Sequence, residues 1–390
     1  MVPWHQLLPA YFKNTQTQNK MKDTQWQGHQ IPDEKHPEHT RFMVQNVRGI
    51  TLEGHTGVDI QAYDQVTLQV DIQAISEHCL DTTKFTVTQN IKEKLRHEFQ
   101  GQAVCQLNSS KDSANQNYKP GGTGLFAFGE SVGRLEPNGR GGDSMGRWSY
   151  LHFRRKNLPP VTFISAYQVC PRPTNPIGNT AYHQQIRALH MSGRTNLHPR
   201  KAFIEDLTCT IKRFRNQGHD IVLGGDFNES IKDQNAGILR LATNADLIDP
   251  FIFFFPHHEE FGTHEAGSRH IDYILMSPRI FHSVKAVGYA PFYYVTKSDY
   301  HPILINFNTK KLFGDTIDLM PPTSFRGVKS NDRQTTTKFI EVMHSELHRK
   351  GAFANQQALD DNIATPTDIE TLDHLIGTSG DIAEQRCKRR

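Results

Sequence analysis

The sequence lacks the features that define several large protein classes. Its longest apolar run, Phe251 to Phe255, is far shorter than the ~20 residues needed to cross a bilayer. The start, Met1 to Gln6, shows no basic segment followed by an apolar core, so no secretory signal is predicted. The five cysteines are scattered and form no Cys-x-x-Cys pair, which argues against a disulfide scaffold or a zinc site. These absences predict an intracellular protein without membrane attachment, and they are compatible with a nuclear location.

Charge and size set only broad limits. The formal net charge is +3 with neutral histidine, which permits a polyanionic partner without requiring one. The 390 residues suffice for one large domain of about 250–300 residues with extensions. Residues 1–40 are polar with little apolar periodicity, and we expect them to be mostly disordered. Residues 310–390 lose strand character and carry one helical pattern at 335–348, so we expect a partly helical appendage after a domain spanning 41–309.

Short strands alternate with a few helices between these extensions. A helix is expected at 199–216, because Pro199 suits a first turn and Gly218 follows as a stop. Many strands with few helices favour an α/β sandwich of two sheets flanked by helices. Strand patterns cover 41–49, 70–77, 121–128, 148–153, 161–167, 221–223, 271–276 and 301–307, a glycine-rich loop is expected at 138–146, and further helices are expected at 89–99 and 234–246.

The most informative segment is Gly224 to Asn228, which follows the apolar run Ile221 to Leu223. Glycine lets the chain turn where no side chain would fit. Asp226 and Asn228 then project from the same face of an extended continuation. An ionisable acceptor and a neutral amide are thus expected at the end of a buried strand, where α/β folds tend to build their sites.

Other polar side chains end or interrupt apolar strand patterns in the same way. One of them, Asp272, lies inside a strand, where a lone buried carboxylate is costly unless it is paired or bound to a metal. Carboxylates grouped with histidine, tyrosine and asparagine suit hydrolysis of a phosphoester with a hard divalent cation, because Mg²⁺ prefers oxygen ligands. A base for the water and donors for the phosphoryl oxygens complete such a site. The set comprises Asn46, Glu77, Tyr167, Asp226, Asn228, Asp272, Asp299 and His301.

The order of these motifs along residues 41–307 resembles the endonuclease/exonuclease/phosphatase superfamily. Within it, Asn46 to Gly49, Gly224 to Asn228 and Ser268 to Leu275 are most similar to the apurinic/apyrimidinic-type endonuclease of non-LTR retrotransposons. The resemblance implies a four-layered α/β sandwich of two mainly antiparallel sheets flanked by helices. It also implies Mg²⁺ as cofactor, with Mn²⁺ able to substitute.

The resemblance implies roles for individual residues. Glu77 and Asp299 would bind Mg²⁺, with Asn46 close by. Asp226 would activate or align the attacking water, and Asn228 would contact the phosphate.

Three further roles follow from the same resemblance. Tyr167 would donate a hydrogen bond toward the phosphate. His301 would stabilise the pentacovalent transition state, and Asp272 would orient that histidine.

The last motif departs from the family pattern Ser-Asp-His-x-Pro. Tyr300 follows Asp299 at the histidine position, and His301 comes one residue late. A one-residue slip in an extended strand turns a side chain to the opposite face. Two arrangements therefore stay open: a bulge delivers His301 to the site, or Tyr300 lines it.

The sequence thus predicts a Mg²⁺-dependent phosphodiesterase, similar to the DNA endonucleases of non-LTR retroelements. We expect a DNA substrate, no membrane, no obligate protein partner and a monomer. A phosphatase or lipid phosphodiesterase of the same fold and a catalytically dead retroelement remnant are the alternatives. Residues 140–147 and 154–156 are basic and could meet DNA phosphates or simply be solvated. The histidines at 257, 258, 264 and 270 match no standard ligand spacing and are expected in solvated loops.

Overall fold

The computed structural model describes residues 25–51, 65–99, 102–112, 119–171, 177–233, 235–295, 298–314, 332–361 and 365–387. The chain divides into a large unit, Met1–Thr82 with Asn90–Met320, and a small unit, Thr83–Gln89 with Pro321–Arg390. Within the described residues, no helix combines the length and apolar character needed to cross a membrane.

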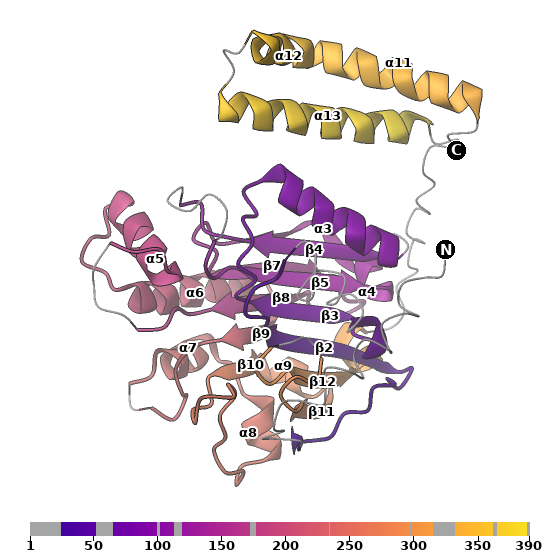
Figure 1. Cartoon of the computed structure of the whole chain (residues 1–390). Helices are drawn as coiled ribbons and strands as arrows, with labels where there is room; N and C mark the ends of the chain where they lie inside the picture. The colour runs from indigo at the N-terminus through magenta and orange to yellow at the C-terminus, as the bar shows by residue number, and fades with distance from the viewer. Residues whose placement is uncertain are drawn as a thin grey trace, which may run out of the picture. The chain divides into compact units, whose positions relative to one another are not determined.

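One half of the large unit is a seven-stranded sheet with the order β1-β11-β12-β2-β3-β5-β4 (Figure 1). Strands β2 and β3 pair in parallel, and the other neighbours are antiparallel. The strands are β1 (Gln27–Gly28), β2 (His39–Asn46), β3 (Ile72–Ser76), β4 (Ala103–Asn108), β5 (Thr123–Phe128), β11 (Val284–Tyr289) and β12 (Ile303–Asn308).

The other half is a five-stranded sheet with the order β10-β9-β8-β7-β6. Strands β8 and β9 pair in parallel, and the remaining pairs are antiparallel. Apolar side chains from both sheets, such as Phe42, Phe163 and Val222, form one buried core between them. The strands are β6 (Leu135–Gly142), β7 (Trp148–Phe153), β8 (Val161–Tyr167), β9 (Asp220–Asp226) and β10 (Asp272–Met276).

Helices cover the five-stranded sheet and form the small unit. The apolar faces of α6 (Pro199–Asn216) and α7 (Gly237–Ala245) pack on β8, β9 and β10. The architecture confirms the predicted α/β sandwich of two mainly antiparallel sheets flanked by helices. The other helices of the large unit are α4 (Glu130–Gly133), α5 (Ala181–Met191), α8 (Pro250–Phe254), α9 (Pro278–Phe281) and α10 (Thr309–Phe313), and α3 (Phe85–Glu98) spans the division between the units. The small unit contains α11 (Arg333–Arg349), α12 (Ala352–Asp360) and α13 (Pro366–Cys387).

The boundaries of the large unit differ from the predicted 41–309. Strand β1 pairs with β11, and Ile31 is buried, so residues 25–40 belong to the unit, whereas residues 1–24 lie outside the described part. At the other end, Leu312 and Phe313 of α10 are buried in the core between the sheets. These apolar residues lie in short segments within polar sequence. A domain boundary predicted from composition therefore leaves them out.

The expected glycine-rich loop at 138–146 is also partly wrong, because β6 extends through Gly142. A Cβ atom at Gly141 would lie 2.5 Å from the Tyr150 hydroxyl oxygen. Glycine here leaves room for the Tyr150 side chain of the neighbouring strand and does not mark a loop.

Gly224 and Gly225 likewise lie inside β9 and not in a turn after it. A Cβ atom at Gly224 would lie 2.4 Å from a methyl carbon of Val44, and one at Gly225 would lie 1.9 Å from the Ala166 carbonyl oxygen. The glycines therefore permit the close approach of β9 to β2 and β8. That approach brings Asp226 near Asn46.

We expect Gly224→Ala to lower the free energy of unfolding by about 1–3 kcal/mol, the usual cost of overpacking a core. In a Val44→Ala background the added methyl finds space, so the same substitution should cost measurably less. Urea unfolding of the four proteins of this double-mutant cycle measures the coupling. Equal costs in both backgrounds would contradict the steric explanation.

Candidate active site

The polar ends of five strands, three from one sheet and two from the other, meet at one end of the sandwich. Asp226, the last residue of β9, pairs with Tyr167 of β8 on one side and with Asp272 of β10 on the other. In the opposite sheet, Asn46 ends β2 beside Ser76 of β3, and Glu77 follows directly. The fold thus places the predicted residues of both sheets at a common edge.

Asn46 links the two sheets through its side-chain amide. Its Nδ2 donates to Asp226 Oδ2 at 2.9 Å and to Glu77 Oε2 at 3.2 Å. Its Oδ1 accepts from the backbone N–H of Arg48 at 2.9 Å, which fixes the orientation of the amide. With 1% of its surface exposed, Asn46 is a buried bridge between two carboxylates.

Tyr167 donates its hydroxyl hydrogen to Glu77 Oε1. Burial, followed by the negative charges of Glu77 and Asp226, raises the pKa of Tyr167 well above its ordinary value. The phenol therefore keeps its proton and remains a hydrogen-bond donor.

Buried like charges dominate the electrostatics of this edge. Burial and then the charge of Glu77 raise the pKa of Asp226 to about 7, although the Asn228 N–H, at 2.8 Å, and Asn46 stabilise its ionised form. Burial and the charge of Asp226 raise the pKa of Asp272 well above its ordinary value. Like charges in a low-dielectric site favour protonation or the arrival of a compensating cation.

Asp299 has one oxygen without a partner. Its Oδ2 accepts from Arg48 Nη1 at 2.5 Å and lies 3.2 Å from His264 Nε2. Its Oδ1 is buried and has no hydrogen-bond partner among the residues that the structure describes. An unsatisfied carboxylate oxygen is costly unless a ligand or water completes it.

The candidate ligands suit a hard cation better than a transition metal. Glu77 and Asp299 are carboxylates and offer oxygen atoms only, whereas the Asn46 amide turns its Nδ2 toward Glu77. In the described part of the chain, no three His, Cys, Asp or Glu side chains form a group able to hold a metal by themselves. Mg²⁺ commonly takes one or two carboxylates and completes its shell with water, so this set fits it.

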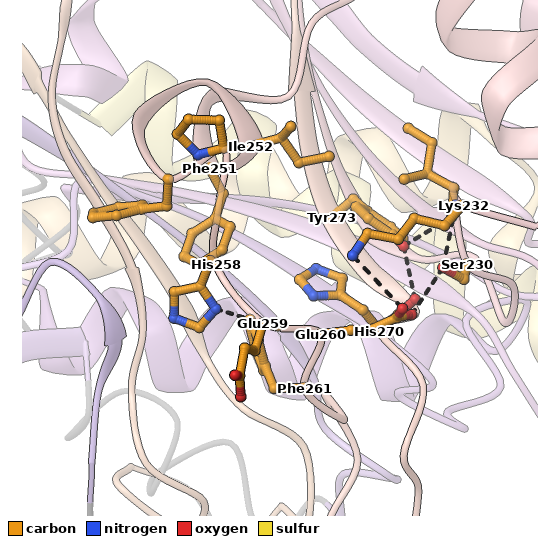
Figure 2. A pocket seen from close by; sticks show the side chains of 13 residues that line it. Ser230, Lys232, Phe251, Ile252, His258, Glu259, Glu260, Phe261, His270 and Tyr273 are labelled. Carbon is orange, nitrogen blue, oxygen red and sulfur yellow. Dashed lines mark hydrogen bonds and ion pairs between the residues drawn. The ribbon is translucent and has the colours of Figure 1, made fainter.

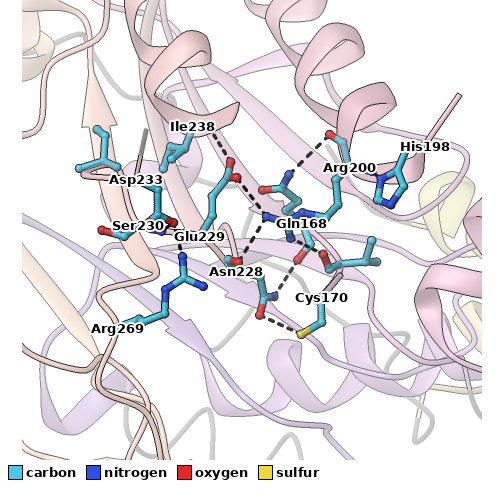
Figure 3. A network of polar contacts seen from close by, with 12 residues as sticks. Gln168, Cys170, His198, Arg200, Asn228, Glu229, Ser230, Asp233, Ile238 and Arg269 are labelled. Atoms are coloured by element: carbon cyan, nitrogen blue, oxygen red, sulfur yellow. Dashed lines mark hydrogen bonds and ion pairs between the residues drawn. The ribbon is translucent and has the colours of Figure 1, made fainter. Parts of the chain in front are cut away.

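Asn228 has a different environment from the one predicted (Figure 3). Its backbone adopts a left-handed conformation with φ of 49°, so the side chain does not continue the face of Asp226. Its Nδ2 donates to the Gln168 carbonyl oxygen at 2.7 Å, and its Oδ1 accepts from the Cys170 thiol at 2.9 Å. The side-chain amide of Asn228 therefore binds the segment after β8, and its backbone N–H donates a hydrogen bond to Asp226.

Arg200 completes this network from helix α6 (Figure 3). Its Nη1 donates to the Val169 carbonyl oxygen at 2.6 Å, and its Nη2 lies 3.0 Å from Glu229 Oε2. Its positive charge also lowers the pKa of Asp226, although burial outweighs this effect. Nothing in the sequence pattern of α6 singles out Arg200, because the segments it joins meet only in the fold.

The structure does not bring His301 to the carboxylates. Its Nδ1 donates to the Ala290 carbonyl oxygen at 2.6 Å, and its ring stacks on Phe292 with centroids 3.6 Å apart. Neither contact involves Glu77 or Asp226. The expected delivery of His301 by a bulge is therefore not observed, and β12 pairs with β2 in regular register from Ile303 onward.

Tyr300 points the other way, as a one-residue slip requires. Its ring packs edge to face on His264, with centroids 4.7 Å apart. Burial, followed by the negative charges of Asp226, Glu77 and Asp272, raises the pKa of Tyr300. Asp272, expected to orient His301, instead accepts from Thr263 Oγ1 at 2.5 Å.

Two of the histidines expected in solvated loops have specific partners. His264 contacts Asp299, as described above. His270 is buried, and its Nε2 lies 2.8 Å from the Tyr289 hydroxyl, which in turn donates to the Asp272 carbonyl oxygen at 3.0 Å. His270 also lines a cavity of about 70 Å³ beside Phe251 and Phe261 (Figure 2). The spacing of the histidines in the sequence does not indicate that His264 contacts Asp299 or that His270 contacts Tyr289.

The basic segments lie away from the carboxylates or are already paired. Arg154 to Lys156 follow Phe153, which pairs with Val161 at the end of the sheet opposite Asp226. Arg147 is buried and donates to Asp143 and Asp206. Arg154 to Lys156 are therefore not positioned to contact a phosphate at the carboxylate edge. Arg147 adjoins that edge, because its carbonyl oxygen accepts from the Tyr167 N–H at 2.9 Å, but its guanidinium is paired with aspartates.

Comparison with known proteins supports the fold assignment. No family model and no curated protein matches the chain. Among solved structures, AP endonuclease LMAP from Leishmania major aligns with a TM-score of 0.51 and 14% identity over 69% of this chain and 88% of that one. The APE2 catalytic domain of Xenopus laevis gives 0.46 and 15% over 69% and 92%, and the endonuclease domain of TRAS1, a telomere-specific non-LTR retrotransposon, gives 0.42 and 13% over 71% and 100%. The likeness to LMAP shows that this chain has the endonuclease/exonuclease/phosphatase fold.

Acid should destabilise the protein through His270. Burial lowers the pKa of His270 from 6.5 to about 3, so the unfolded chain takes up a proton at higher pH than the folded chain does. The resulting stability is present above the unfolded pKa of 6.5 and is lost as pH falls toward the folded pKa. Between pH 7 and pH 4 the loss is about 3 kcal/mol.

The matched variant is His270→Gln, which keeps an N–H for the Tyr289 hydroxyl but does not titrate. Its free energy of unfolding should fall by about 3 kcal/mol less than that of the wild type over this range. Denaturant unfolding at several pH values measures both. Parallel pH profiles would contradict a buried neutral His270.

Proposed function

We propose that this protein is a divalent-metal-dependent phosphodiesterase that nicks DNA. One observation carries the proposal: the Asn46 amide joins Asp226 and Glu77 across the two sheets. Tyr167 and Asp272 adjoin the same group. A fold needs no such concentration of buried negative charge for stability, and hydrolysis of a phosphoester can use it.

Glu77 and Asp299 would hold the Mg²⁺ ion, with the Asn46 amide beside them. The ion supplies charge neutralisation for the phosphoryl oxygens when it is bound. Two features support this assignment: Asp299 Oδ1 has no hydrogen-bond partner among the described residues, and both ligands are carboxylates.

Asp226 would orient the attacking water and accept its proton. Burial beside Glu77 raises the pKa of Asp226, which favours proton acceptance by its carboxylate. The Asn228 N–H holds one carboxylate oxygen of Asp226 and the Asn46 amide holds the other, so the carboxylate is fixed in direction. Tyr167 would supply a hydrogen bond to a phosphoryl oxygen once Glu77 turns to the metal.

DNA is the proposed substrate on two grounds. The motifs at 46–49, 224–228 and 268–275 are similar to those of non-LTR retroelement endonucleases, and the structurally similar LMAP is an AP endonuclease. A phosphatase or lipid phosphodiesterase would share the site and differ in its loops. The position of His301 favours a further alternative, a remnant that kept the fold without the chemistry.

Nicking of supercoiled plasmid tests the proposal. The wild type should nick in Mg²⁺ and stop when EDTA is added. Asp226→Asn removes the base and should lower the rate by at least about 100-fold. Asp246→Asn is the matched control, because Asp246 is an exposed carboxylate at the end of α7 and should leave the rate unchanged.

A folded wild type that nicks no DNA in Mg²⁺ or Mn²⁺ would contradict the nuclease assignment. Activity on inositol or lipid phosphates would then favour the alternative substrates. Inactivity on every phosphoester would favour the remnant.

A further inference from the structure

We infer that Tyr300 is a catalytic residue of this site and that its hydroxyl donates a hydrogen bond to the phosphoryl group at the position where the resemblance led us to expect an imidazole. The inference rests on the proposed function. It concerns which side chain contacts the substrate, so it can fail while the nuclease assignment stands.

The backbone around Tyr300 is fixed from two sides. Its N–H donates to Ser298 Oγ at 3.2 Å, and Ser298 Oγ donates to the Asn46 carbonyl oxygen at 2.5 Å. Tyr300 also forms an antiparallel bridge with His264, and the two rings meet edge to face with centroids 4.7 Å apart. The segment is thereby tied to β2 and to the loop that carries Thr263, which holds Asp272.

The ring of Tyr300 lies beside a candidate metal ligand. It is half-buried and packs edge to face on His264, whose Nε2 lies 3.2 Å from Asp299 Oδ2. Neighbouring residues of an extended segment face opposite sides, so Tyr300 faces away from the packed ring of His301. A phenol carries one hydroxyl hydrogen. It can donate one hydrogen bond to a phosphoryl oxygen without any proton leaving the ring.

His301 cannot take this role in the observed arrangement. Its Nδ1 is occupied by the Ala290 carbonyl oxygen, and its ring lies between Phe292 and Phe261 with 1% of its surface exposed. To reach the carboxylates, the His301 ring would have to break these contacts and move to the opposite side of its backbone segment. In this arrangement the His301 ring packs against Phe292 and Phe261.

The experiment compares kcat and KM for Mg²⁺-dependent cleavage of a short DNA duplex. Tyr300→Phe removes only the hydroxyl, and we expect kcat to fall about 100- to 1000-fold, as for loss of one transition-state donor, with KM changed little. Tyr300→His restores a donor at the same place and should recover part of the loss. Tyr294→Phe is the matched control, because the hydroxyl of Tyr294 donates to Asp33 and its loss should leave kcat unchanged.

His301→Phe should retain kcat within a few-fold while melting at a lower temperature, because it keeps the ring but leaves the Ala290 carbonyl oxygen without its donor. If that variant does not fold, the three tyrosine variants still decide the matter. An unchanged kcat in Tyr300→Phe beside an active wild type would overturn the inference and leave the nuclease assignment standing. An inactive wild type would instead count against the nuclease assignment itself.

Discussion

Mutual repulsion among buried carboxylates is the constraint on which the site depends. Asp226, Asp272 and Glu77 stand at one edge of the sandwich, and the pKa values of the two aspartates are raised because each is buried beside another negative charge. Such an arrangement lowers stability unless a cation, a proton or a fixed donor compensates it. The Asn46 amide and the Tyr167 hydroxyl provide part of that compensation. A bound metal cation would supply the rest of that compensation.

The two sheets must approach closely for this compensation to occur. Asn46 belongs to one sheet and Asp226 to the other, and their hydrogen bond of 2.9 Å spans the interface. Gly224, two residues before Asp226, has no side chain where Val44 packs against it. Core packing and site geometry are therefore linked within β2 and β9. Gly224 allows the two strands to approach, and that approach sets the position of Asp226 relative to Asn46.

Much of the fold and part of the site could be predicted from the sequence. Short apolar and β-branched runs located most strands, and polar residues that end those strands, such as Asp226 and Glu77, indicated the edge of the candidate site. Contacts between distant segments could not be predicted. The hydrogen bonds from Arg48 to Asp299 and from the Cys170 thiol to Asn228 join residues that only the fold brings together. The pattern also left open whether Tyr300 or His301 faces the site, because that depends on the backbone just before β12. The structure shows His301 stacked on Phe292 and Tyr300 packed on His264, whose Nε2 contacts Asp299.

Thermal unfolding at increasing Mg²⁺ concentration tests the central claim most directly, because it detects metal binding without requiring activity. A ligand that binds only the folded state raises the melting temperature as its concentration rises. The account predicts such a rise for the wild type and its loss in Glu77→Gln and Asp299→Asn, which remove one ligand charge each. A wild-type melting temperature that does not change with Mg²⁺ concentration, or an equal rise in all three proteins, would contradict a metal site at the carboxylate edge.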